Sequence, residues 1–289
     1  MRDWLMAAIF WGVPLVYILF RGFRPPDQRF LDRWTRVYGI ELSEANRPMI
    51  VTYLRRTKRI RTVGALAGLV TSVLVVFLTN GAQSNSFFGN GLFLAVVGYL
   101  VGTVVAESVV PRPPRGHIRT ASLVPRTLQD YLPGYAVRVL RAVPIVSAAL
   151  IPIFLFVQGR TRTPNSNIGE LGFAVTSVVV LLMAVGIKAM QRNIVHRPQP
   201  ALPPDLLHAD DAIRSASVHA LAGGGVALSL LWLTYQLGAI GSGIESALLS
   251  WVIAVLAIMS IALALWGWID LAHPKEWRVR RHAGQGSRA

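Results

Sequence analysis

The chain has 289 residues, of which 53% are hydrophobic and only 15% are charged, whereas about 25% of residues are charged in an ordinary soluble domain. Its formal net charge is nevertheless +15, and it contains no cysteine. This composition excludes a soluble globular domain and a disordered chain, and the missing cysteines exclude disulfides, iron–sulfur clusters and thiolate metal sites. A chain that is both apolar and basic is typical of a helical membrane protein with positively charged loops.

Seven apolar segments are long enough to cross a bilayer, which takes about 20 helical residues. In chain order they cover residues 4–20, 62–79, 91–110, 142–158, 170–190, 219–238 and 246–269. Because lipid does not tolerate irregular backbone, each segment is expected to be a helix. The sequence therefore predicts an all-α polytopic membrane bundle that forms a single membrane domain.

Basic residues are concentrated in alternate connections between these segments. Of the 29 Lys and Arg residues, 26 lie in or beside three long loops and the C-terminal tail, so the outer connections carry no net charge. The loops cover residues 21–61, 111–141 and 191–218, and the tail covers 270–289. The positive-inside rule places them in the cytoplasm, with the N-terminus outside and the C-terminus inside. The whole excess of +15 then lies on the inner side, where anionic lipid is the expected counter-charge.

A proline signal follows each span that runs inward. The four signals are Arg24-Pro25-Pro26, Arg112-Pro113-Pro114, Arg197-Pro198 and His273-Pro274. Proline cannot continue a helix, and arginine can anchor a helix end at the lipid headgroups. The pattern predicts a lead helix followed by three hairpins that enter from the same side, which is a parallel internal repeat. Convergence of interface loops on a composition rich in Arg and Pro is the alternative.

Two neighbouring spans carry pairs of glycines spaced four residues apart. Gly64 and Gly68 lie in the second span, and Gly98 and Gly102 lie in the third. Small residues at this spacing let helices approach closely. We expect these glycines to form a tight hairpin within one chain, and homodimerisation through either motif is the alternative.

Glu107 and Lys188 are ionisable residues within apolar spans, both near the predicted cytoplasmic ends. Ionisable residues inside spans are candidates for function, so we predict an ion pair between these two. Two side chains that reach the interface independently are the alternative. No charge lies near the middle of any span, which argues against the buried carboxylate relay of an ion-coupled pump.

Apolar residues recur at helical spacing from Phe30 to Tyr38, and arginines form a second stripe. This pattern predicts an amphipathic helix on the inner leaflet. Its candidate contacts with anionic lipid are Arg29, Arg33, Trp34 and Arg36. A helix packed on the other cytoplasmic loops is the alternative. No nucleic-acid partner is expected, because no recognition fold accompanies these basic residues.

The third cytoplasmic loop contains His208, Asp210 and Asp211, which are metal-ligating residue types. Their spacing fits no strong metal signature. The two aspartates suit an N-terminal cap for the helix that leads into the sixth span. We therefore predict no metal site and no cofactor, and an intramembrane enzyme built on this cluster is a minor alternative.

The sequence contains no P-loop, no His-Glu-x-x-His, no Gly-x-Ser-x-Gly, and no lysine in the last span for a retinal Schiff base. It therefore predicts a non-catalytic, permease-like transport subunit in the inner (plasma) membrane of a bacterium, a source inferred from the excess of Arg over Lys. Its basic loops could bind a separate cytoplasmic ATPase or regulatory subunit. A membrane scaffold or regulator that binds anionic lipid or a cytoplasmic partner is the alternative.

Overall fold

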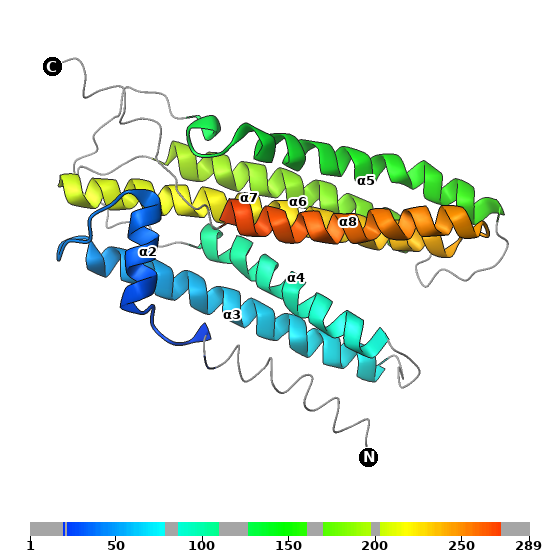
Figure 1. The fold of residues 1–289 in the computed structure, drawn as a ribbon, viewed down its shortest axis with the longest axis horizontal. Coiled ribbons are helices and arrows are strands. Elements are labelled where there is room, and N and C mark those ends of the chain that lie inside the picture. The colour runs from blue at the N-terminus through cyan, green and yellow to red at the C-terminus, as the bar shows by residue number, and fades with distance from the viewer. Residues whose placement is uncertain are drawn as a thin grey trace. The chain divides into compact units, whose positions relative to one another are not determined.

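The computed structural model describes residues 20, 22–78, 86–109, 127–160, 170–197 and 203–272. Within these ranges all regular structure is helical, which confirms the predicted all-α class for the described part (Figure 1). The chain divides into two compact units. Unit 1 comprises Met1–Leu123, Pro198–Ser217 and Glu276–Arg278. Unit 2 comprises Val124–Arg197, Val218–Lys275 and Val279–Ala289.

Unit 1 contains α2 (Gln28–Tyr38), α3 (Arg47–Leu78), α4 (Ser86–Ser108) and the first part of α7 (Pro204–Ser242). Helix α2 lies across the start of α3 (Figure 1). It begins after Asp27, whose carboxylate accepts a 2.8 Å hydrogen bond from the Phe30 N–H. It ends at Gly39, whose φ of 65° is the left-handed conformation that glycine adopts without strain.

One face of α2 is buried against protein. Its Leu31 joins a core with residues of α3 and of the first part of α7. The other members of this core are Ile50, Tyr53, Leu54, Ala209, Ile213 and Ala216. Trp34 and Tyr38 pack against it, whereas Arg29, Arg33 and Arg36 are exposed. Much of the apolar face predicted to lie on lipid is therefore covered by protein.

The glycines of α3 and α4 lie where the two helices meet. A Cβ atom on Gly64 would lie 2.8 Å from the Cα atom of Gly102, and one on Gly98 would lie 2.9 Å from the Cα atom of Gly68. Real Cβ atoms do not approach other atoms this closely, so only glycine fits. The two helices are thus in backbone contact within one hairpin.

Unit 2 contains the 3-10 helix η1 (Leu128–Asp130), α5 (Gly134–Arg160), α6 (Glu170–His196), the rest of α7 and α8 (Ala247–Ala272). Its four long helices run alongside one another (Figure 1). Helix α7 touches the other three: Gly225 packs on Ile187 of α6 and Leu140 of α5, and Gly223 packs on Ala272 of α8. Small residues let these helices surround α7 closely.

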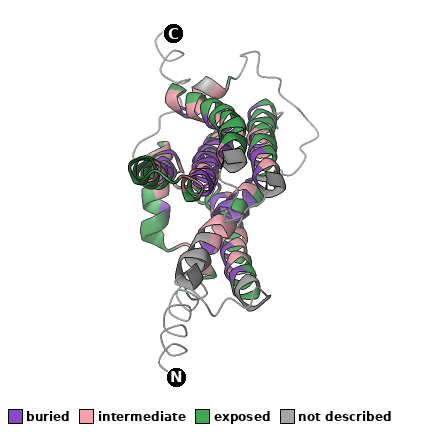
Figure 2. Ribbon diagram, turned by 90° about the vertical axis from the view of Figure 1, so that its right-hand side faces the viewer, coloured by how far each residue is buried: buried purple, intermediate pink, exposed green. Residues whose placement is uncertain are grey.

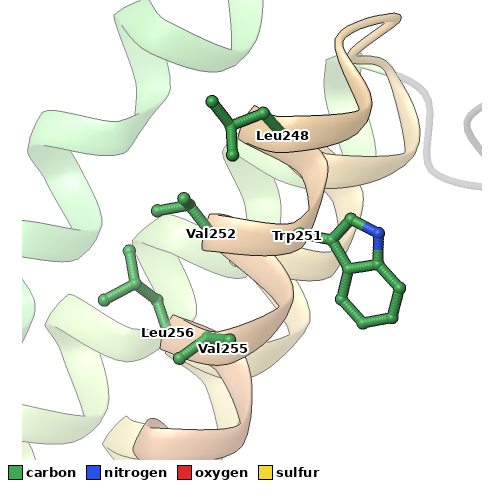
Figure 3. Close-up of a pocket in the computed structure, with 5 residues that line it drawn as sticks. All are labelled: Leu248, Trp251, Val252, Val255 and Leu256. Atoms are coloured by element: carbon green, nitrogen blue, oxygen red, sulfur yellow. The ribbon is translucent and has the colours of Figure 1, made fainter.

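Four helices in the described ranges are long and apolar enough to cross a membrane: Gly134–Val157, Phe173–His196, Pro204–Ser242 and Ala247–Ala272. Helices α5, α6 and α8 leave large apolar side chains exposed, and exposed faces appear green in Figure 2. On α8, Leu248 is 78% exposed and Trp251 is 72% exposed, beside Val252, Val255 and Leu256 (Figure 3). Apolar surface of this kind is stable in lipid and costly in water, so the chain is a membrane protein.

The helices are longer than the predicted spans. Helix α3 begins at Arg47 and α7 begins at Pro204, so much of the predicted loops 21–61 and 191–218 is helical. Residues 62–79 and 91–110 correspond to the apolar parts of α3 and α4, and residues 4–20 lie almost entirely outside the described residues. The seven-span count and its orientation stay predictions.

The helical hairpins differ in how they pack. Helices α3 and α4 meet through glycines, whereas α5 and α6 meet where Phe154 and Phe173 stack with ring centroids 4.0 Å apart. Helix α5 also contains Pro144 and Pro152 in its interior. The packing of these two hairpins therefore gives no support to the predicted repeat.

Candidate functional site

A buried ion pair joins α3 to α4 within unit 1. The Glu107 side chain is fully buried, and its Oε1 lies 2.7 Å from Nη2 of Arg61, whose side chain is 18% exposed. The Tyr53 hydroxyl donates a 3.2 Å hydrogen bond to the other carboxylate oxygen. The Glu107 charge is thus balanced by one guanidinium and bound by one hydroxyl, both from α3.

Two tyrosines near Glu107 remain protonated. Burial raises the pKa of the Tyr53 hydroxyl well above its usual range, and the negative charge of Glu107 raises it further. Burial and the same charge also raise the pKa of Tyr38. Tyr53 also lies in one buried core with Ile213 and Ala216 of α7. The buried cluster therefore connects α3 and α4 to the first part of α7.

The sequence prediction paired Glu107 with Lys188. The structure shows Arg61 as an ion-pair partner of Glu107 within unit 1, whereas Lys188 belongs to unit 2. The pairing with Lys188 stays a prediction. Arg61 lies in the predicted cytoplasmic loop just before the second span, so the sequence pattern did not indicate it as an intramembrane charge.

A second buried ion pair lies on α7 itself. Asp210 and Arg214 are four residues apart, their side chains are 3% and 2% exposed, and Oδ2 lies 2.8 Å from Nη2. The predicted helix cap at Asp210 and Asp211 is therefore wrong, because the helix begins at Pro204. Proline is favoured at the first helical position, and Asp205 supplies the acidic residue that suits the first turn.

The remaining sequence-predicted candidates lie on the surface or outside a site. His208 is exposed, and in the described ranges no three His, Cys, Asp or Glu side chains form a group that could hold a metal ion. Trp34 is half-buried against protein, while Arg29, Arg33 and Arg36 are exposed. Lipid contact by these residues stays a prediction.

The interface between α6 and α7 in unit 2 contains uncharged polar groups that the sequence analysis did not single out. The buried residues of α6 lie three, four or seven positions apart, on one face of the helix: Phe173, Ser177, Val180, Ile187, Gln191 and Val195. This stripe faces α7, because Ser177 is hydrogen-bonded to Gln236 and Ile187 contacts Gly225. Ser229 lies four residues after Gly225 and seven before Gln236, which puts it on the same face of α7 as these two residues. We call Ser177, Gln191, Ser229 and Gln236 the α6–α7 seam.

One end of the seam is a closed hydrogen-bond network. The Ser147 hydroxyl of α5 donates to Oε1 of Gln236 at 2.7 Å, and Nε2 of Gln236 donates to the Ser177 hydroxyl at 2.6 Å. The Ser177 hydroxyl in turn donates to the Phe173 carbonyl at 2.9 Å. All three polar side chains are buried, so three helices are linked through one amide.

The other two polar side chains of the seam have hydrogen-bonding groups that are not satisfied. Gln191 and Ser229 are each 1% exposed, yet Nε2 of Gln191 and Oγ of Ser229 have no hydrogen-bond partner among the described residues. A buried polar group without a partner costs about 1–3 kcal/mol. Two such groups in one interface require an explanation from function or from a bound molecule.

Replacing Gln236 with Leu should lower the free energy of unfolding by about 1–2 kcal/mol, because Ser147 and Ser177 then lose their shared partner. Thermal unfolding in detergent micelles measures this loss. Tyr235→Phe is the control on the adjacent, partly exposed position and should leave stability unchanged. Equal midpoints for the two variants would contradict the network.

Comparison of the chain with protein-family models, with curated proteins and with solved structures gives no match.

Proposed function

We propose that the chain is a non-catalytic, permease-like membrane protein of a bacterial inner membrane. It would span the bilayer seven times, with its N-terminus outside and its basic loops in the cytoplasm. The apolar exposed faces of α5, α6 and α8 support the membrane setting. The α6–α7 seam carries the proposal, because it places polar groups inside a helical bundle where lipid would exclude them.

The length of the seam supports a route rather than a local contact. Ser177 lies beside Gln236 and Ile187 beside Gly225, so the helices are antiparallel and Gln191 falls near the level of Leu221. From that level to Gln236 is about 22 Å at a rise of about 1.5 Å per residue. The hydrocarbon core is about 30 Å thick, so the polar groups extend over most of it.

Transport is tested with the full chain in proteoliposomes. Stopped-flow light scattering would measure the entry of glycerol and urea, and we expect entry at least several-fold faster than into empty liposomes. Ser229→Leu, which replaces the seam hydroxyl with a larger apolar side chain, should remove most of the increase, whereas Leu248→Ala on the exposed face of α8 should not. Rates equal to those of empty liposomes would contradict a permease for these solutes.

The topology is tested separately with single cysteines, since the natural chain has none. We expect Ser246→Cys, at the exposed turn before α8, to react with a membrane-impermeant maleimide in intact spheroplasts. Glu44→Cys, before α3, should react only after the membrane is opened. The reverse pattern would overturn the proposed orientation.

A membrane regulator that binds anionic lipid is the second candidate. It is favoured by the arginines of α2, because Arg29, Arg33 and Arg36 project from the side of the helix opposite to buried Leu31. Phe30 on the flank is 45% exposed and suits the headgroup region. Changing the three arginines to Gln should lower the fraction of anionic lipid that copurifies with the protein. A separate cytoplasmic ATPase or regulatory subunit remains a proposed partner of the same basic face.

A further inference from the structure

We propose that the α6–α7 seam binds small, uncharged, hydrogen-bonding molecules at Gln191 and at Ser229. This proposal rests on the proposed function and names the class of molecule that the seam takes. Water is the smallest member of the class, and a neutral polyol or amide is a larger one. The network of Ser147, Gln236 and Ser177 closes the other end of the seam.

Two buried glutamine side chains of the seam differ in how far their hydrogen-bonding groups are satisfied. Gln236 uses its oxygen and its nitrogen in hydrogen bonds of 2.7 and 2.6 Å. Gln191 is equally buried, but within the described part of the chain its Nε2 has no hydrogen-bond partner. Native structures leave few buried polar groups unsatisfied, and those that remain are commonly bonded to buried water or to a ligand. Gln191 therefore requires an acceptor that the helices do not provide.

Ser229 repeats the same feature on the facing helix. Its Oγ has no partner in the ranges that the structure describes, whereas the hydroxyl of Ser260, buried on α8, donates to the Leu230 carbonyl at 2.8 Å. A serine in a helix can also bond to a carbonyl of its own helix, but Ser229 makes no such bond. Its hydroxyl is thus free to donate to, or accept from, a bound molecule.

The Gln191 amide and the Ser229 hydroxyl would bind two separate molecules and not a single shared one. Between their levels, Gly225 packs on Ile187, where a Cβ atom on the glycine would lie 2.7 Å from Cδ1 of Ile187. This tight contact separates the Gln191 position from the Ser229 position. Small molecules would therefore occupy the seam one behind another.

The surroundings select an uncharged ligand. Among the described residues of unit 2, the buried polar side chains belong to Ser, Gln and His, and none belongs to Asp, Glu, Lys or Arg. An ion in this interface would lose its hydration without gaining a counter-charge. A neutral molecule loses fewer interactions and regains them from amide and hydroxyl groups.

Single cysteines provide the test in the full chain, reconstituted in liposomes. A thiol reacts as the thiolate, and an apolar environment suppresses its ionisation, so the rate reports hydration. Ser229→Cys and Gln191→Cys should react with the small neutral reagent methyl methanethiosulfonate at least tenfold faster than Ala227→Cys. Ala227 is the matched control because it is equally buried and lies two residues from Ser229, on another side of α7.

If Ser229→Cys reacts at the same rate as Ala227→Cys, the proposal is wrong. Cysteine is nearly the same size as serine, so Ser229→Cys decides the question even if Gln191→Cys fails to fold.

Glycerol at high concentration shows whether the bound molecule is a solute or water. If it slows the Ser229→Cys reaction severalfold, a neutral solute binds the seam, and an unchanged fast rate assigns the seam to water. If the cysteines react quickly but no solute enters the liposomes, the proposed transport function is wrong and the proposed binding site stands. If solute enters but the cysteines do not react, the binding site is wrong and transport stands.

Discussion

Replacing Glu107 with Gln is expected to lower the free energy of unfolding by about 3 kcal/mol, because it leaves the guanidinium of Arg61 largely buried without its counter-charge. The Tyr53 hydroxyl also loses a charged acceptor. Arg61→Met should cost a similar amount, since it leaves the fully buried carboxylate unpaired. Unfolding in mixed micelles, followed by circular dichroism, would measure both losses.

A double variant separates this ion pair from general sensitivity of the site. Arg61→Met combined with Glu107→Met should be more stable than the sum of the single losses predicts, because no charge is then left unpaired. Glu44→Gln, on an exposed residue, is the control and should have no effect. The opposite result is a loss of about 3 kcal/mol for Lys188→Met and no loss for Arg61→Met. It would show that Glu107 pairs with Lys188, as the sequence predicts, and not with Arg61.

The partner of Glu107 could have been found from the sequence. The four glycines predict that the second and third spans meet as an antiparallel hairpin, and the structure sets Gly64 against Gly102 and Gly68 against Gly98. Extending that register by one turn brings Arg61 to within about two residues, or about 3 Å along the helix axis, of the level of Glu107. The predicted span begins just after this arginine, although long helices commonly continue beyond the hydrocarbon core.

The environment of α2 could not be found from the sequence in the same way. A periodic apolar stripe shows that one face of a helix is covered, but it does not show whether lipid or protein covers it. In the structure Leu31 lies in one core with Ile213 of α7, which is far away in the chain, and Trp34 packs against that core. This contact depends on α7 beginning at Pro204, well before the predicted span.

The α6–α7 seam escaped prediction because its residues carry no charge. Ser147, Ser177 and Gln236 are separated by long stretches of sequence, and each alone is unremarkable in a helix. Only their proximity shows that one amide serves three helices. The interior of unit 2 is therefore more polar than its few intramembrane charges suggested. A polar interior favours a permease over a scaffold.

Replacing Gly98 with Ala should lower the free energy of unfolding by about 3 kcal/mol, because the added methyl group meets backbone that cannot move aside without separating the helices. The Cβ atom would lie 2.9 Å from the Cα atom of Gly68 and closer still to the Gly64 carbonyl oxygen. Thermal unfolding in micelles gives the measurement.

Gly186→Ala is the matched control for this substitution. Gly186 also lies within a helix, but, apart from its chain neighbours and the backbone of its own helix, no atom of the described residues lies within 4 Å of the position its Cβ would take. Alanine favours a helix over glycine by up to about 1 kcal/mol, so Gly186→Ala should stabilise the protein slightly. Opposite signs for the two variants establish that the contact, and not the loss of glycine, determines the effect. If the glycines instead joined two chains, Gly98→Ala would convert a dimer to a monomer in light scattering and leave the stability of each chain intact.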